Sequence, residues 1–103
     1  MRQTKVARTY AKSLLDLAVE KGELENVKSD MDLIFNTCKE SKELQGLLVS
    51  PVVPTNKKVA VLKELFGKSV SGFALSFIEL LAQKGRESIL LDISYSFATI
   101  YLA

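Results

Sequence analysis

Two stretches of this chain are apolar around too much of their circumference to be ordinary surface helices. They are residues 6–20 and residues 72–84. A surface helix of a small domain usually needs one apolar stripe, somewhat over about 100° wide, to face its core. With successive residues placed about 100° apart, each stretch carries an apolar arc of roughly 200°. The surplus must be covered by another part of the chain or by a partner, so these two faces are the best physical lead to function.

Each of the two predicted helices divides into two neighbouring apolar stripes. In the first helix, one stripe holds Val6, Tyr10, Ser13 and Leu17, and the other holds Ala7, Ala11, Leu14, Leu15 and Ala18. In the second, one stripe holds Phe73, Phe77, Leu80 and Lys84, and the other holds Ala74, Ile78, Leu81 and Ala82. A buried hydroxyl needs a partner and a buried ammonium costs still more, so the stripes with Ser13 and Lys84 are predicted to face outward.

Side by side, the two outward stripes would form a shallow groove. Its predicted lining is Val6, Tyr10, Leu17, Phe73, Phe77 and Leu80. An amphipathic helix from another protein could lie in such a groove. The alternative is that the helices simply cover one another and the surplus apolar surface is interior. Tyr10 could equally be a core tyrosine with its hydroxyl at the rim.

Helical signals run through nearly the whole chain and predict an all-α protein, a compact six-helix bundle in one domain. The predicted helices are 4–21, 23–39, 42–49, 56–66, 72–84 and 86–101. Gly22, Gly67 and Gly85 are placed to end helices, and Ser41, Thr55, and Ser69 or Ser71 to cap them. Periodicity predicts two buried sides: Leu24, Val27, Met31, Ile34, Phe35 and Cys38 in the second helix, and Val59, Leu62, Leu65 and Phe66 in the fourth.

The residues that usually carry catalysis are missing from the sequence. There is no histidine, the usual general base near neutral pH. A single cysteine without histidine makes a structural zinc site implausible, and a packing role is expected for Cys38. Segment 67–72 does not fit a phosphate-binding loop, because the second glycine, Gly72, is not followed by the lysine and the serine or threonine of that pattern. We therefore expect no enzymatic activity, no cofactor and no metal.

The charged residues give weak signals for a partner. A net charge of +2 is too small to demand nucleic acid or an anionic membrane. The basic clusters, Lys57 with Lys58 and Lys39 with Lys42, lack interleaved aromatic residues, so nucleic acid is not an expected partner. The acidic pairs, Glu23 with Glu25 and Asp30 with Asp32, are expected to be solvated. No window approaches the roughly eighteen unbroken apolar residues of a membrane span, so no direct membrane insertion is expected.

Three short motifs carry a family resemblance. Residues 6–14 read VARTYAKSL, residues 47–53 read LLVSPVV, and residues 80–86 read LLAQKGR. They resemble, in this order, the A-R-x-Y-A-x-x-L, L-x-x-P and L-x-x-x-G-R segments of the delta subunit of bacterial and chloroplast F-type ATP synthases. The mitochondrial counterpart is the oligomycin-sensitivity-conferring protein. Each motif is weak alone, but the three together are specific, and the resemblance covers essentially the whole chain.

The resemblance implies a six-helix domain on top of the catalytic head. There it would bind the amino-terminal helix of an alpha subunit in a groove between the first and fifth helices. The family's site residues carry over to Tyr10, Ser13, Leu17, Phe77, Leu80 and Lys84. Together with the two apolar arcs, the predicted partner-binding set is Val6, Tyr10, Ser13, Leu14, Leu17, Phe73, Phe77, Leu80, Leu81 and Lys84.

The implied role is that of a non-catalytic stator component, which helps to link the head to the peripheral stalk during proton-driven ATP synthesis. It would lie peripherally at the cytoplasmic face of the bacterial inner membrane and be soluble when isolated. The family's full chain has a second domain, which joins the stalk b subunits. We expect residues 1–103 to be the amino-terminal domain, with that second domain absent from this chain. The alternative function is a small helical RNA-binding or antitermination-type bundle, which would need a basic face.

Overall fold

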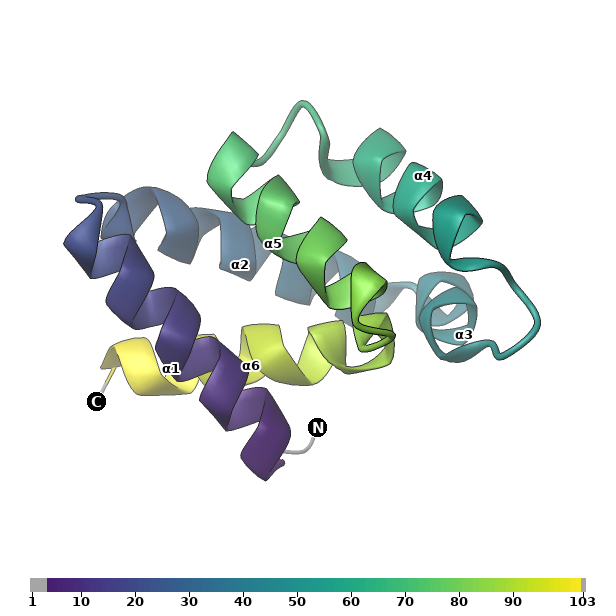
Figure 1. Ribbon diagram of the computed structural model, residues 1–103. Coiled ribbons are helices and arrows are strands. Elements are labelled where there is room, and N and C mark those ends of the chain that lie inside the picture. Colours follow the sequence, from purple (N-terminus) through teal and green to yellow (C-terminus); the bar gives the residue numbers. More distant parts are fainter. Residues whose placement is uncertain (1–3, 103) are drawn as a thin grey trace.

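Six α-helices and one short 3₁₀ helix make up most of residues 4–102, the part of the chain that the computed structural model describes (Figure 1). The helices are α1 (Lys5–Glu20), α2 (Leu24–Glu40), α3 (Lys42–Val49), α4 (Thr55–Phe66), α5 (Gly72–Gln83), the 3₁₀ helix η1 (Glu87–Ile89) and α6 (Leu90–Leu102). No strand occurs in this range, so the predicted all-α six-helix bundle is confirmed. Within the same range, every helix is too short or too polar to cross a membrane.

Local sequence explains where most of the helices begin and end. The side-chain hydroxyls of Thr4, Ser41 and Ser71 each accept a hydrogen bond from the backbone N–H three residues later, which caps α1, α3 and α5. Gly22 and Gly85 have φ angles of 67° and 70°, in the left-handed region that favours glycine. These two glycines end α1 and α5 as predicted.

Two predictions about α4 are wrong. Thr55 is the first residue of the helix and not its cap, because Pro54 precedes it in an extended conformation and leaves no side-chain cap. Leu65 is 46% exposed, whereas Lys58, Leu62 and Phe66 are buried. The buried stripe therefore follows an i, i+4, i+8 spacing that begins at a lysine. Periodicity missed it because a lysine is normally counted as a surface residue.

The core lies where α1 and α2 pack on α6, with α4 packed on α5 beside them (Figure 1). Its largest fully buried side chains include Met31 and Ile34 from α2, Phe66 from α4 and Phe97 from α6. Cys38 is also fully buried, which confirms its packing role, and burial raises the pKa of its thiol to about 11. In Figure 1, α1 and α5 run roughly antiparallel across the front of the bundle.

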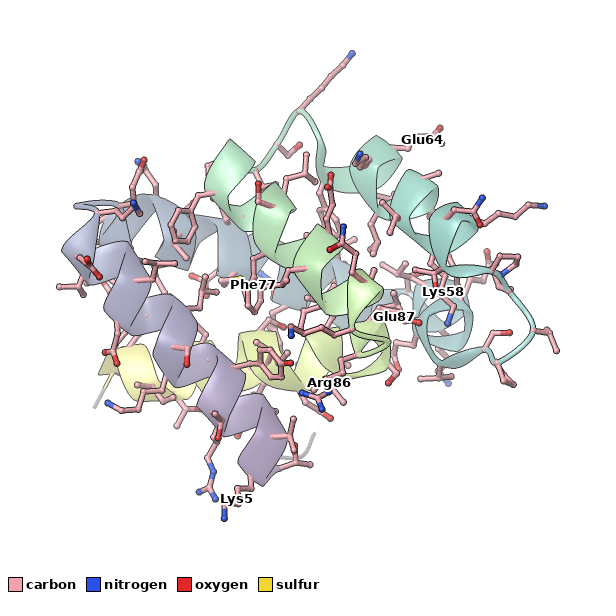
Figure 2. All side chains as sticks on the ribbon, viewed as in Figure 1. Lys5, Lys58, Glu64, Phe77, Arg86 and Glu87 are labelled. Atoms are coloured by element: carbon pink, nitrogen blue, oxygen red, sulfur yellow. The ribbon has the colours of Figure 1, made fainter. Side chains whose placement is uncertain are left out.

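Two polar clusters inside the bundle correct predictions about surface charge. The Lys58 ammonium lies 2.7 Å from a carboxylate oxygen of Glu87 and 3.0 Å from the carbonyl oxygen of Leu48 (Figure 2). Lys58 therefore does not belong to an exposed basic cluster. Asp30 is 8% exposed and accepts hydrogen bonds from both the backbone N–H and the hydroxyl of Ser71. Its predicted solvation is also wrong, because it holds the start of α5 against α2.

Candidate functional site

A hollow of about 520 Å³ lies between α1 and α5. Its lining residues, which define what we call the α1–α5 groove, are Lys5, Val6, Thr9, Tyr10, Ser13, Leu14, Leu17, Phe77, Leu80 and Arg86. Most of this wall is apolar, and it is open to solvent rather than enclosed. Figure 2 shows Lys5, Phe77 and Arg86 on the same side of the molecule.

The two apolar stripes of each wall helix face the directions predicted from their polar interruptions. In α1, Ala7, Ala11 and Ala18 are fully buried, whereas Val6 and Leu17 are 47% and 42% exposed. In α5, Ala74, Ile78, Leu81 and Ala82 are buried, whereas Leu80 is 43% exposed. The stripes that contain Ser13 and Lys84 are therefore the outward ones, as predicted. The alternative, that all the surplus apolar surface is interior, is wrong for the described residues.

The walls of the groove meet at Tyr10 of α1. Its ring packs edge-on against Phe77 of α5, with ring centroids 6.4 Å apart and an interplanar angle of 65°. Such an edge-to-face arrangement suits the opposite partial charges of ring edge and ring face. Arg86 donates a hydrogen bond of 2.7 Å from Nη1 to the Tyr10 hydroxyl, and its guanidinium carbon lies 5.6 Å from the ring centroid. Tyr10 is thus a half-buried side chain that both walls share.

The turn after α5 aims Arg86 at the groove. The N–H of Gly85 donates to the carbonyl of Ala82, and the N–H of Arg86 donates to the carbonyl of Leu81. These bonds and the positive φ of Gly85 form a helix-ending motif of the Schellman type. The chain reverses there and enters η1 immediately. Arg86 is therefore held at the groove by backbone geometry as well as by its bond to Tyr10.

Most of the predicted partner-binding residues come together in the groove. Those that line it are Val6, Tyr10, Ser13, Leu14, Leu17, Phe77 and Leu80. Phe73, Leu81 and Lys84 do not line it. Phe73 lies in the first turn of α5 and packs against the core, and Leu81 is only 1% exposed. Lys84 is exposed at the C-terminal cap of α5.

Three lining residues were missed by the sequence analysis. Lys5 and Thr9 lie at the edge of the polar side of α1, where helical spacing assigns them to solvent. Arg86 begins the predicted sixth helix, 86–101, and therefore lies outside the two helices from whose stripes the groove was predicted. The signal that could have found it is its place directly after a helix-ending glycine, where the chain must turn back towards the bundle.

The groove has a basic character at its rim. Its charged lining residues, Lys5 and Arg86, are both cationic. The ion pairs within residues 4–102 join other side chains, so neither of these cations is paired with a carboxylate in the described chain. The same residues contain no group of three or more histidine, cysteine or acidic side chains that could hold a metal ion. The groove offers apolar contacts and hydrogen bonds rather than an acid–base pair.

Comparison with known proteins gives a consistent result. The family model for the ATP synthase delta (OSCP) subunit matches residues 6–103. The chain is 42% identical over 101 residues to ATP synthase subunit delta of Cytophaga hutchinsonii, covering 98% of this chain and 56% of that protein. It is 36% identical over 101 residues to the chloroplastic ATP synthase delta chain of Chlamydomonas reinhardtii, covering 97% of this chain and 46% of that protein. The chain thus spans about half the length of these relatives.

A similar fold occurs in a solved structure. One chain in the cryo-EM structure of Polytomella F-ATP synthase, rotary substate 2C, superimposes with a TM-score of 0.80 at 23% sequence identity. The match covers 100% of this chain and 91% of that chain. At this level of identity the likeness supports the helical architecture and nothing finer.

Proposed function

Because the chain belongs to the ATP synthase delta (OSCP) family, we propose that it forms the head-binding domain of a delta subunit in an F-type ATP synthase. In this role it is a non-catalytic part of the stator and binds the amino-terminal helix of an alpha subunit in the α1–α5 groove. It thereby helps to link the catalytic head to the peripheral stalk during proton-driven ATP synthesis. The observation that carries the proposal is the open apolar groove between two helices that are otherwise packed into the bundle.

The dimensions of the groove suit a helix as its occupant. Val6 and Leu17 lie eleven residues apart on α1, which corresponds to about 17 Å, or roughly three helical turns. Side chains at i, i+3, i+4 and i+7 of an amphipathic helix could contact both walls along this length. Such a contact would bury the exposed faces of Val6, Leu17 and Leu80 at once.

The rest of the role follows from the family and is proposed with it. Residues 1–103 would be the amino-terminal domain of a longer subunit, and contact with the stalk b subunits would be made by its second domain. The subunit would then be peripheral to the membrane, at its cytoplasmic face in a bacterium. An extended apolar contact suits this task, since a stator join must resist torque and needs no chemistry. The RNA-binding alternative is not favoured, because Lys58 is buried and cannot add to a basic face.

Calorimetric titration tests the proposal directly. The titrant is a synthetic peptide of the amino-terminal segment of the alpha subunit from the same organism. We expect one-to-one binding with a negative change in heat capacity, as apolar surface is buried. Leu80→Asp should weaken this binding tenfold or more, because burying a leucine side chain contributes about 1.5–3 kcal/mol and about 1.4 kcal/mol is a factor of ten.

Leu65→Asp is the matched control for this variant. Leu65 is 46% exposed near the C-terminal end of α4 and does not line the groove, whereas Leu80 is 43% exposed near the same end of α5 and does. Both variants should keep the circular dichroism spectrum of the wild type. Equal peptide affinity in folded Leu80→Asp and Leu65→Asp would refute the groove as the binding site. No binding by the folded wild-type domain would refute the proposed partner.

A further inference from the structure

We infer that Arg86, assisted by Lys5, binds a carboxylate side chain of the helix that occupies the α1–α5 groove and so sets the direction in which that helix lies. The inference rests on the proposed function, since it concerns the same groove and the same class of occupant. It adds a polar contact that determines specificity to a site otherwise defined by apolar walls.

The first support is the unused hydrogen-bonding capacity of Arg86. A guanidinium group carries five N–H donors in a planar fork that matches a carboxylate. In the structure one of its nitrogens, Nη1, donates to the Tyr10 hydroxyl, and the side chain is otherwise exposed. The adjacent carboxylate of Glu87 is not available to it, because Glu87 is buried and paired with Lys58.

The second support is that Arg86 is held in place before any partner arrives. Its backbone is fixed by the turn after α5, and its side chain is fixed against the face and the hydroxyl of Tyr10. A preorganised side chain loses less conformational entropy when it binds than a freely rotating one. This distinguishes Arg86 from the exposed Arg8, which lies on the solvent side of α1 and does not line the groove.

The third support is that the two ends of the groove differ in charge. Lys5 and Arg86 both lie towards the end of the groove where α1 begins (Figure 2). The first turn of α1 contains no acidic residue that would offset them. At the other end, about three turns along α1, the wall is formed by Leu17. Consider an occupant helix with an acidic residue near one of its ends. In one orientation along the groove, this residue would pair with Arg86 and Lys5. In the opposite orientation, it would lie against the apolar wall at Leu17.

The experiment extends the alpha-peptide titration to Arg86→Gln, with Arg8→Gln as the control that removes the same charge outside the groove. We expect Arg86→Gln to weaken peptide binding by about five- to tenfold, a range typical of a charge-assisted contact at the rim of an interface, and Arg8→Gln to change it less than about twofold. Arg86→Lys should recover only part of the loss, because an ammonium cannot form the fork contact. The affinity of the wild type should also fall more steeply with added salt than that of Arg86→Gln.

Peptide variants identify the carboxylate. Each acidic residue of the peptide is replaced in turn by its amide, and one replacement should weaken binding to the wild type while leaving binding to Arg86→Gln unchanged. Wild-type binding that Arg86→Gln and Arg8→Gln reduce equally, or that no amide replacement affects, would overturn the inference and leave the groove standing. Failure of the folded wild type to bind the peptide would overturn the proposed function and this inference with it.

Discussion

The buried ion pair between Lys58 and Glu87 gives the sharpest test of how the second half of the bundle is held together. The two side chains are 5% and 9% exposed, and the Lys58 ammonium also donates to the carbonyl of Leu48. It thereby joins α4 to the end of α3 and to η1. The second carboxylate oxygen of Glu87, Oε1, is buried without a hydrogen-bond partner among the described residues. The cost of burying the Glu87 carboxylate is therefore offset mainly by its ion pair with Lys58.

The substitution Lys58→Met removes the charge and keeps most of the apolar stem. It leaves a carboxylate and the Leu48 carbonyl buried without their donor. Removing one partner of a buried pair costs about 3–5 kcal/mol, which is a large share of the roughly 5–15 kcal/mol that stabilises a typical domain. The double variant Lys58→Met/Glu87→Leu removes both charges, and we expect it to regain most of that loss, ending within about 1 kcal/mol of the wild type.

Urea unfolding at neutral pH, followed by far-ultraviolet circular dichroism, measures both variants. Lys57→Met is the control, since Lys57 is the exposed neighbour in the same helix turn and should change stability by less than about 0.5 kcal/mol. A Lys58→Met variant within about 1 kcal/mol of the wild type would refute the reasoning. So would a double variant less stable than Lys58→Met, because the two charges would then not be compensating each other.

Two further predictions concern glycine and cysteine. Gly46→Ala should raise the free energy of unfolding in urea by about 0.5–1 kcal/mol, because Gly46 is helical and has open space where a Cβ would lie. Gly85→Ala should lower it by about 1–2 kcal/mol, because the φ of Gly85 is 70°. Equal effects of the two substitutions would contradict this prediction. Cys38 should resist thiol reagents in the native state, because it is buried and its pKa is raised from 9.0 to about 11. As pH rises from about 9 towards 11, the unfolded chain loses the Cys38 proton before the folded chain does. The free energy of unfolding should therefore fall over this range. Stability below pH 9 should be unaffected by this group, and the Cys38→Val variant should lose this slope.

The orientation of α1 and α5 could be predicted from the sequence because single polar residues interrupt otherwise apolar stripes. Ser13 and Lys84 mark which stripe must face water, and both are exposed in the structure. The cost of burying a hydroxyl or an ammonium without a partner is large enough to decide this from composition along one helix. The same reasoning wrongly placed Phe73 in the groove, because the first turn of α5 packs its ring against the core.

The contacts that sequence analysis missed are all between residues far apart in the chain. Lys58 pairs with Glu87 across 29 positions, Asp30 binds Ser71 across 41, and Arg86 binds Tyr10 across 76. Helical periodicity describes neighbours three or four residues apart and carries no information about such pairs. It therefore placed Lys58 and Asp30 in solvent, because a charged residue is normally buried only with its partner.

The walls of the α1–α5 groove can be altered with little effect on the bundle behind them. Val6, Leu17 and Leu80 are each 42–47% exposed, whereas Ala7, Ala11 and Ala18 on the reverse of α1 are fully buried. Both wall helices are anchored from the other side, α1 on α6 and α5 on α4. Protein engineers could therefore exchange these three side chains for larger, smaller or charged ones and retain the fold. If the groove binds a helix as proposed, versions of the domain with different wall residues would bind different helices.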